Sequence, residues 1–275
     1  MTGATSHQER PTRAPAAARR PRRPLTPARR WALRLASVAA ILVAWQIYGS
    51  LLNPILLSSP TAVAAAAVDM VRDGSLPQAL AASLVVLALG LGSGIVAGVA
   101  LGLLAGRSET VAAVLELPVT ALYATPAVAL IPLIVLWFGF ETTAKTVVVF
   151  LFVVFPVLIN TTRGVRETDP ELIEVARTFC SSERRMWADL ILPSALPFIV
   201  TGIRLAIGRA LIGVIVAEYY TALSGLGELI ARSANSFQTA RMFVPIVVVA
   251  LLGVVLTAAL EWAERRLARW RATAA

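Results

Sequence analysis

Long, continuous apolar runs restrict what this sequence can fold into. Residues 76–105 and 243–260 are apolar almost throughout. A transmembrane helix needs about 20 mostly apolar residues, and its backbone must satisfy its hydrogen bonds inside a helix or a closed barrel. A barrel strand alternates apolar and polar residues, which these runs do not. We therefore predict an all-α polytopic membrane protein.

The overall composition agrees with this fold class. Of the 275 residues, 57% are hydrophobic and only 15% are charged, against roughly 25% charged in a soluble domain. We expect six transmembrane helices, near residues 31–52, 76–105, 117–140, 144–162, 195–217 and 243–260. The amphipathic segment 59–74 is too polar to span and is predicted to lie at the outer interface.

The basic residues predict an orientation. The net charge is +9, and many arginines lie in the tail at residues 1–30, in the loop at about 163–194 and in the tail at 263–275. Nucleic-acid binding would be another interpretation of so many arginines. The positive-inside rule explains their placement without it. We therefore expect a plasma-membrane protein with both termini in the cytoplasm and no nucleic-acid partner.

Four segments follow from these patterns. Residues 1–30 are predicted to be a disordered basic cytoplasmic tail, because they are rich in Arg, Pro and Ala without apolar periodicity. Residues 31–75 hold the first transmembrane helix and the interfacial helix. Residues 76–262 form a five-helix membrane domain, and residues 263–275 form a second basic cytoplasmic tail.

The residues needed for catalysis or metal binding are scarce. The single histidine, His7, lies in the N-terminal tail, and Cys180 is the only cysteine. No GxxxxGK[ST] phosphate-binding loop occurs. We therefore expect neither an enzyme nor a metal or cofactor site in this chain.

Glycines recur every fourth residue in the second predicted span. They are Gly90, Gly94, Gly98, Gly102 and Gly106. Such a ridge lets two helix backbones approach closely in a bilayer. We interpret the glycine ridge as a site of close helix packing. The alternative interpretation is a surface that slides during transport.

Prolines and charges inside the later spans are candidates for a path. Pro118, Pro126 and Pro132 in the third span and Pro156 in the fourth favour kinks. In the fifth span, Arg204, Gly208 and Glu218 share one helical face, and Arg209 points away from it. Charges at membrane depth often mark a transport path. Arg204 could instead reach the inner headgroups or pair with an acidic residue of the cytoplasmic loop.

The polar segment 167–197, ETDPELIEVARTFCSSERRMWADLILPSALP, is predicted to form two short amphipathic helices joined by a turn. Asp169 and Pro170 are typical of a helix start, and apolar residues then recur at helical spacing. Ser182 would cap the second helix, which is expected to stop near Pro193. Such a shape suits docking into a partner's groove, or lying on lipid.

This segment resembles the EAA motif of ABC-importer permeases. Glu174, Ala176, Leu192 and Pro193 match that motif, and Val175 replaces an alanine. Cys180 stands where the motif has glycine, so it would be strained if the turn needs a positive φ. LYATPAVALIPLIVLWFGF, TGIRLAIGRALIGVIVAE and SGLGELI are similar to the nitrate/sulfonate/taurine branch of that family.

The resemblance implies an importer driven by a separate ATPase. Two permease copies would pair, an extracytoplasmic binding protein would deliver the solute, and the partner ATPase would use ATP. The loop, with Glu174, Val175, Ala176, Phe179, Cys180, Leu192 and Pro193, would be its coupling site. The solute would be a small anion such as an alkanesulfonate, taurine or nitrate.

Two alternatives stay open from the sequence. A permease of the same architecture could import another solute, such as a pyrimidine vitamin precursor. A self-contained secondary carrier or channel would be a different class of protein, but it would be expected to show inverted repeats, and none is evident.

Overall fold

The structure, a computed structural model, describes residues 26–267, and every regular element in this part of the chain is a helix. The two predicted basic tails therefore lie largely outside the described residues. In chain order the elements are α1 (Pro27–Leu51), α2 (Pro60–Arg72), α3 (Ser75–Arg107), α4 (Glu109–Ala124), η1 (Ala127–Leu130), α5 (Ile131–Phe138), α6 (Thr142–Arg166), α7 (Pro170–Thr178), α8 (Glu183–Arg185), η2 (Met186–Ile191), α9 (Leu192–Thr221), α10 (Leu226–Asn235) and α11 (Thr239–Leu267).

The chain divides into two compact units, residues 1–44 and 45–275. The described part of the first unit is the beginning of α1. Its apolar side chains are exposed, with Leu35 and Ile41 each 67% accessible, as expected of a helix surface that faces lipid. The second unit contains the other helices and is described by itself.

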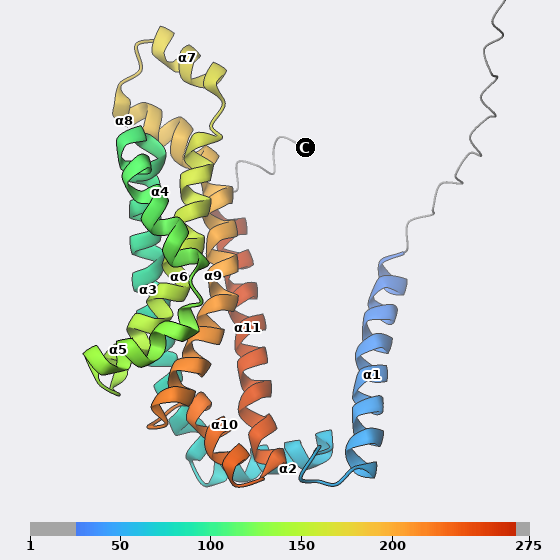
Figure 1. Cartoon of the computed structure of the whole chain (residues 1–275). Helices are drawn as coiled ribbons and strands as arrows, with labels where there is room; N and C mark the ends of the chain where they lie inside the picture. The colour runs from blue at the N-terminus through green and yellow to red at the C-terminus, as the bar shows by residue number, and fades with distance from the viewer. Residues whose placement is uncertain (1–25, 268–275) are drawn as a thin grey trace, which may run out of the picture. The chain divides into compact units, whose positions relative to one another are not determined.

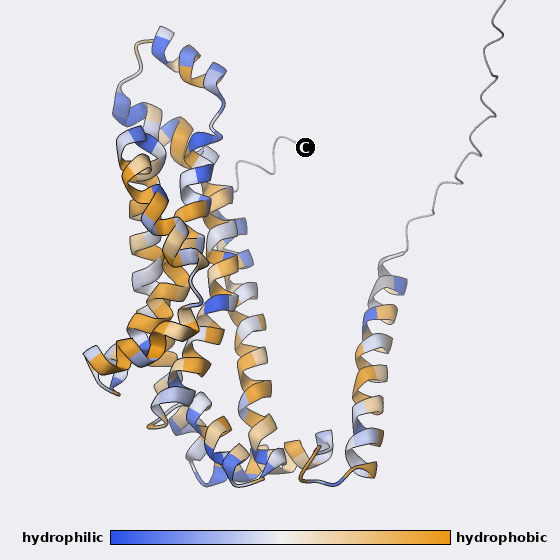
Figure 2. Cartoon of the chain, viewed as in Figure 1, coloured by the Kyte–Doolittle hydropathy of each residue, from blue (hydrophilic) through white to orange (hydrophobic). Residues whose placement is uncertain are grey.

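The membrane-spanning helices follow the predicted apolar runs. Among the described residues, five stretches are long and apolar enough to cross a membrane, and the bent pair α4 and α5 would make a sixth. In the second unit, α3, α6, α9 and α11 run side by side, with α7 at one end and α2 and α10 at the other (Figure 1). Hydrophilic residues gather at these two ends (Figure 2). The predicted all-α polytopic class is confirmed.

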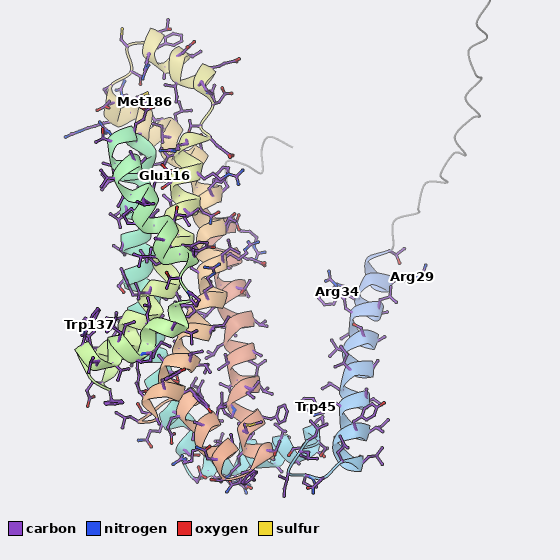
Figure 3. The ribbon with its side chains drawn as sticks, viewed as in Figure 1. Arg29, Arg34, Trp45, Glu116, Trp137 and Met186 are labelled. Atoms are coloured by element: carbon purple, nitrogen blue, oxygen red, sulfur yellow. The ribbon has the colours of Figure 1, made fainter. Side chains whose placement is uncertain are left out.

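The third predicted span, 117–140, is not one helix. α4 ends at Ala124, and the chain resumes in η1 and α5 at an angle of 89° to it. Pro126 lies in the gap, where it lacks a backbone N–H and disfavours helix for the residue before it. Glu116 on α4 and Trp137 on α5 lie on the two sides of the break (Figure 3). The kink expected from the prolines is therefore a complete interruption.

The glycine ridge lies against α6. A Cβ added to Gly90, Gly94 or Gly98 would stand 2.5–2.7 Å from the Cβ of Val149, Val153 or Val157. Gly102 and Gly106 meet α6 in the same way, at Thr161 and Val165. No side chain larger than hydrogen fits at these positions, so the two backbones approach closely along their length.

A neighbouring face of α6 supports α9. Val149, Val153 and Val157 are completely buried, in one cluster with Ala206 and Ala210 of α9. Small residues on α9 again allow close approach, and Gly202 faces the Pro156 carbonyl of α6. α6 is thus the central helix of the unit, and its two neighbours are positioned through it.

The predicted interfacial segment 59–74 contains α2. Ser59 caps α2 by accepting a hydrogen bond from the amide of Ala62 at 3.4 Å, and Pro60 occupies its first turn. Val63 and Met70 are buried in a cluster with Leu226, Leu229 and Val244. α2 therefore packs against α10 and α11 as an integral part of the bundle's end.

We predict that Gly98→Ala destabilises the protein by about 1–3 kcal/mol, as is typical of overpacking. The new methyl group would lie 2.7 Å from the Val157 Cβ and 2.8 Å from the Val154 carbonyl oxygen. The measurement is thermal unfolding of the detergent-solubilised protein. Gly92→Ala on the same helix is the control, because no atom lies within 4 Å of its added Cβ. Equal melting temperatures for the two variants would contradict the packing argument.

Candidate functional site

The first half of the predicted coupling loop is α7. The Asp169 carboxylate caps it by accepting a hydrogen bond from the amide of Glu171 at 2.9 Å, and Pro170 occupies the first turn. Glu171 lies near the positive end of the helix dipole. The helix start predicted at Asp169 and Pro170 is thus present.

Cys180 forms the turn that ends α7. Its φ is +51°, in the left-handed region that glycine favours. The amide of Ser181 donates to the Ala176 carbonyl at 3.0 Å, and the amide of Cys180 donates to the Arg177 carbonyl at 2.9 Å. This pair of bonds is a Schellman motif, which normally has glycine at the Cys180 position. The strain expected from the cysteine is therefore real, and the turn keeps its usual shape.

The second half of the loop runs into α9 without a break. Ser182 caps α8, and the π-helical turn η2 continues directly into α9 at Leu192. The prediction that this helix stops near Pro193 is wrong, because proline is tolerated in the first turn of the helix that follows. Met186 lies at this end of the bundle, and Met186 and Trp187 pack against Val165 and Ile191 (Figure 3).

An ion pair ties this half of the loop to α3. The Arg107 guanidinium lies 2.8 Å from the Glu183 carboxylate and 5.8 Å from the Trp187 ring centroid. The pair is exposed, so its contribution to stability is small. Its effect is to orient α8 and η2 beside the end of α3, while α7 extends beyond the bundle (Figure 1).

The apolar face of α7 has no partner in the described chain. Leu172, Val175 and Phe179 are 49%, 52% and 82% exposed, and Glu174 is exposed beside them. Ala176 is half-buried, Leu192 is 39% exposed and Pro193 is intermediate. An apolar stripe on a protruding, polar-flanked helix is typical of a docking surface.

The structure separates the three predicted path residues. Arg204 is exposed and pairs with Glu264 of α11 at 3.1 Å. Gly208 faces open space. Glu218 is completely buried. The helical wheel places them on one face, but α10 covers that face near Glu218 and not near Arg204. A path role for Arg204 and Gly208 stays a prediction, whereas the Glu218 carboxylate has no access to open space.

The Glu218 carboxylate is held by hydrogen bonds. It accepts from the Ser83 hydroxyl at 2.7 Å and from the amide of Gly227 at 2.9 Å, and the Ser83 oxygen accepts from the amide of Leu226 at 2.8 Å. Buried carboxylates need such donors. The network joins α3, α9 and the start of α10, and no local sequence pattern indicates that Ser83 takes part.

The SGLG segment before α10 is fitted to this network. Gly225 has a φ of +109°, and a Cβ there would overlap the Glu218 carboxylate. Lys145 of α6 is 3% exposed, and its ammonium donates to the Ser224 carbonyl at 3.1 Å and to the Ser224 hydroxyl at 3.0 Å. The loop is thus fixed from two sides, which sets the position of α10.

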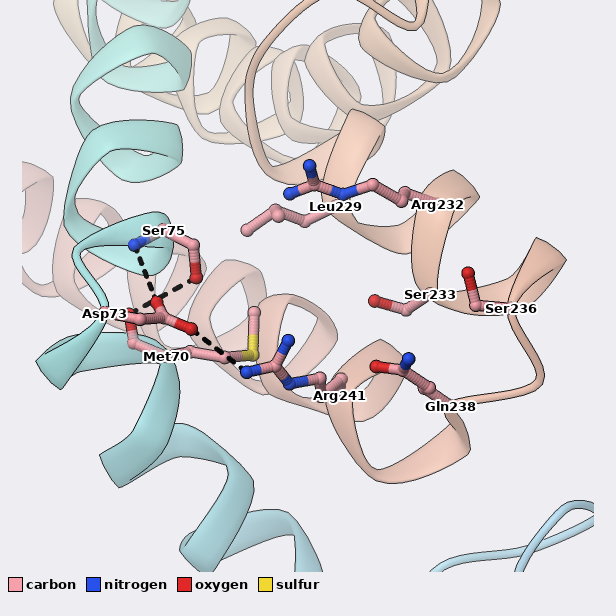
Figure 4. A pocket seen from close by; sticks show the side chains of 9 residues that line it. All are labelled: Met70, Asp73, Ser75, Leu229, Arg232, Ser233, Ser236, Gln238 and Arg241. Atoms are coloured by element: carbon pink, nitrogen blue, oxygen red, sulfur yellow. Dashed lines mark hydrogen bonds and ion pairs between the residues drawn. The ribbon is translucent and has the colours of Figure 1, made fainter.

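A polar pocket lies at the end of the bundle opposite α7. Its volume is about 460 Å³, and Figure 4 shows the side chains that line it. Asp73 accepts a hydrogen bond from the amide of Ser75 at 2.9 Å and pairs with Arg241 at 3.0 Å. The hydrogen bonds from Ser75, with a smaller effect of the Arg241 guanidinium, lower the pKa of the Asp73 carboxyl. Arg232 also lines the pocket, so anionic and cationic groups face this opening together.

Comparison with known proteins identifies the class. Residues 94–269 match the family described as "Binding-protein-dependent transport system inner membrane component". In the crystal structure of an amino acid ABC transporter with histidines, one chain has the same fold: the TM-score is 0.54 at 20% identity, over 70% of this chain and 91% of that chain. The chain belongs to this family of importer permeases.

Curated relatives extend over most of the chain. The chain is 35% identical over 245 residues, 88% of each protein, to a Bacillus subtilis (strain 168) protein named "Putative aliphatic sulfonates transport permease protein SsuC". It is 33% identical to the formylaminopyrimidine transport permease protein ThiX of Halalkalibacterium halodurans, over 84% of this chain and 92% of ThiX. It is 30% identical to the taurine transport system permease protein TauC of Escherichia coli (strain K12), over 86% and 89%.

These matches establish a multi-pass membrane permease subunit of an ABC transporter, which is a transport component and not an enzyme. Permeases of this family work with an ATPase and a solute-binding protein. The alternative of a self-contained carrier is therefore set aside. No cluster of His, Cys, Asp or Glu within the described residues has the geometry to hold a metal ion.

We predict that Cys180→Gly stabilises the coupling turn by about 1 kcal/mol, because glycine adopts the left-handed region without the Cβ clash. Hydrogen exchange of the amides at positions 180 and 181 should slow by roughly fivefold, since 1 kcal/mol corresponds to that factor. Ser181→Gly is the control, because Ser181 does not have a positive φ. Faster exchange in Cys180→Gly than in the unmodified protein would contradict the strain at this position.

Proposed function

We propose that this chain is the membrane-spanning subunit of an ATP-driven importer for small aliphatic sulfonates. The observation that carries the proposal is its similarity, across nearly its whole length, to permeases named for aliphatic sulfonates. A second such permease, from Escherichia coli (strain K12), is 36% identical over 89% of this chain. Import of a formylaminopyrimidine is the second candidate, because ThiX is similar at 33% identity.

We further propose that α7 binds a separate ATPase. Support comes from its exposed apolar stripe, its position beyond the end of the bundle and its match to the EAA motif. Glu174 beside the stripe would make the polar contact. ATP would be bound and hydrolysed on that partner, and no cofactor would be needed in this chain. The arginines at this end of the bundle support placing it, with both termini, in the cytoplasm.

Two copies of the chain would pair, and the solute path would lie between them. A binding protein would deliver the solute at the opposite end, where α2 and α10 lie. Movement of the ATPases would then switch access from one side of the membrane to the other, which is a shift between two pre-existing states.

The helices provide a direct mechanical connection for this switch. η2 continues into α9, which has 30 residues and is therefore about 45 Å long at 1.5 Å per residue. Glu218 near the far end of α9 is bonded to the start of α10. A displacement of the docked loop would be transmitted along α9 to the opposite end of the bundle.

The substrate is tested by reconstitution of the complete importer, with its ATPase and binding protein, in proteoliposomes. We expect ATP-dependent uptake of ethanesulfonate that exceeds uptake of nitrate and of a formylaminopyrimidine. Uptake of the pyrimidine without sulfonate uptake would favour the second candidate. Uptake of neither would reject both substrate assignments.

We predict that Glu174→Arg abolishes ATP-dependent ethanesulfonate uptake, reducing it at least tenfold, while insertion into the membrane is unchanged. The reversed charge would face the site on the ATPase that accepts a carboxylate, and like charges across an interface strongly disfavour docking. Uptake and the amount of ATPase retained on the purified permease are the two measurements.

Glu109→Arg is the matched control for this variant. Glu109 is exposed in the first turn of α4, at the same end of the bundle but outside the loop. Its reversal should leave ATPase retention close to normal. Full uptake by Glu174→Arg, or equal loss in the two variants, would remove Glu174 from the coupling role.

A further inference from the structure

An arginine lies in the interior of α9, far from both ends of this long apolar helix. Arg209 is 17 residues after Leu192 and 12 before Thr221, the two ends of α9, so it is more than about 18 Å from either end. A charge at this depth is costly in a bilayer and marks a functional position unless it is compensated. A side chain this far from both ends cannot reach the headgroups easily.

The contacts of Arg209 do not neutralise it. Its guanidinium donates a hydrogen bond of 2.7 Å to the Tyr123 hydroxyl and lies 4.8 Å from the centroid of that ring. Within residues 26–267, no carboxylate lies within ion-pair distance of it. Arg204, one turn earlier on α9, differs because Glu264 pairs with it. Arg209 therefore presents an uncompensated positive charge.

This charge lines a cavity at the break in the third span. Because α4 and α5 diverge by 89°, side chains cannot pack continuously there, and a cavity of about 350 Å³ opens between the break, α6 and α9. Arg209 and Tyr123 supply polar groups at its wall. Apolar side chains supply most of the rest, including Leu122, Leu130, Leu151, Phe152, Phe155 and Ile212.

The wall of the cavity selects a type of ligand. A guanidinium with free N–H groups binds oxyanions strongly, and the Tyr123 hydroxyl, which accepts from Arg209, keeps its own proton to donate. The apolar side chains suit a hydrocarbon tail. No carboxylate is among the described residues that line the cavity, so an ammonium group would have no partner, and nitrate would leave the apolar wall uncovered.

We propose that this cavity binds the transported solute, with Arg209 and Tyr123 holding the sulfonate group and the apolar wall covering the tail. The ligand class is an aliphatic sulfonate without a cationic group, in preference to taurine. This assignment rests on the proposed function. It moves the path residue predicted on α9 from Arg204 to Arg209, the neighbour that the helical wheel turned away from the path.

The test is equilibrium binding of radiolabelled ethanesulfonate to the purified permease–ATPase complex without binding protein. Nanodiscs of phosphatidylcholine keep anionic headgroups out of the measurement. We expect Arg209→Gln to weaken binding at least tenfold, because the charge-assisted hydrogen bonds to the sulfonate are lost. Arg209→Lys should restore part of the affinity. Arg204→Gln, the matched control, should bind like the unmodified protein, and every variant should co-purify with the ATPase in the same amount as the unmodified protein.

The placement of the hydrocarbon tail against the apolar wall is tested with sulfonates of different chain length. Ile212→Trp would reduce the space along the apolar wall. It should therefore weaken binding of butanesulfonate at least fivefold more than binding of methanesulfonate. An equal effect on both ligands would overturn the placement of the tail.

The outcomes separate this site from the proposed function. Normal ethanesulfonate uptake and binding by Arg209→Gln would overturn the site and leave the importer assignment intact. Equal losses in Arg204→Gln and Arg209→Gln would also overturn it. Binding at Arg209 without ATP-dependent sulfonate uptake would reject the proposed function while the site stands. Failure of the unmodified protein in both measurements would reject both.

Discussion

Close contact between the backbones of α3 and α6 is the interaction on which the rest of the structure depends. Lipid removes most of the hydrophobic drive for helices to associate, so packing must hold them together. The glycine ridge allows that packing along five successive turns. With α6 fixed against α3, a neighbouring face of α6 positions α9, and α9 carries the proposed coupling loop at one end and the Glu218 network at the other.

The polar groups at depth fall into two kinds. Lys145 and Glu218 are buried and hydrogen-bonded to the SGLG segment, so they fix the start of α10. Arg209 instead faces a cavity beside an interrupted helix, without a carboxylate partner in the described chain. Arg209 is exposed, and a charge inside a membrane-spanning helix is unfavourable without a partner. This difference separates the groups that build the fold from the group that we propose binds a ligand.

The proposed coupling loop is continuous with the helix that lines the proposed binding cavity. Its first helix keeps an apolar stripe exposed, and its second half is continuous with the helix that carries Arg209. The strained Cys180 turn orients the first helix relative to the second. The proposed docking surface and the proposed binding cavity are therefore connected through η2 and α9.

Much of this architecture could be predicted from local patterns, and the exceptions have physical reasons. The apolar runs predicted the helical class, and Asp169–Pro170 predicted the start of α7, because both signals depend only on neighbouring residues. Pro126 predicted a kink, but the 89° turn depends on packing that no local pattern contains. Periodicity grouped Arg204 with Glu218, yet their environments differ because Glu264, Ser83 and Gly227 come from distant segments. The mismatch at Cys180 was visible in the sequence, and the structure shows that Cys180 adopts the left-handed conformation that glycine favours.

The most direct test of the importer assignment is affinity purification of the tagged chain from native membranes in mild detergent. The co-purifying proteins would then be identified and quantified. The account predicts an ATPase with a phosphate-binding loop in an amount near that of the permease. A preparation without such an ATPase, active in solute flux without ATP, would contradict it.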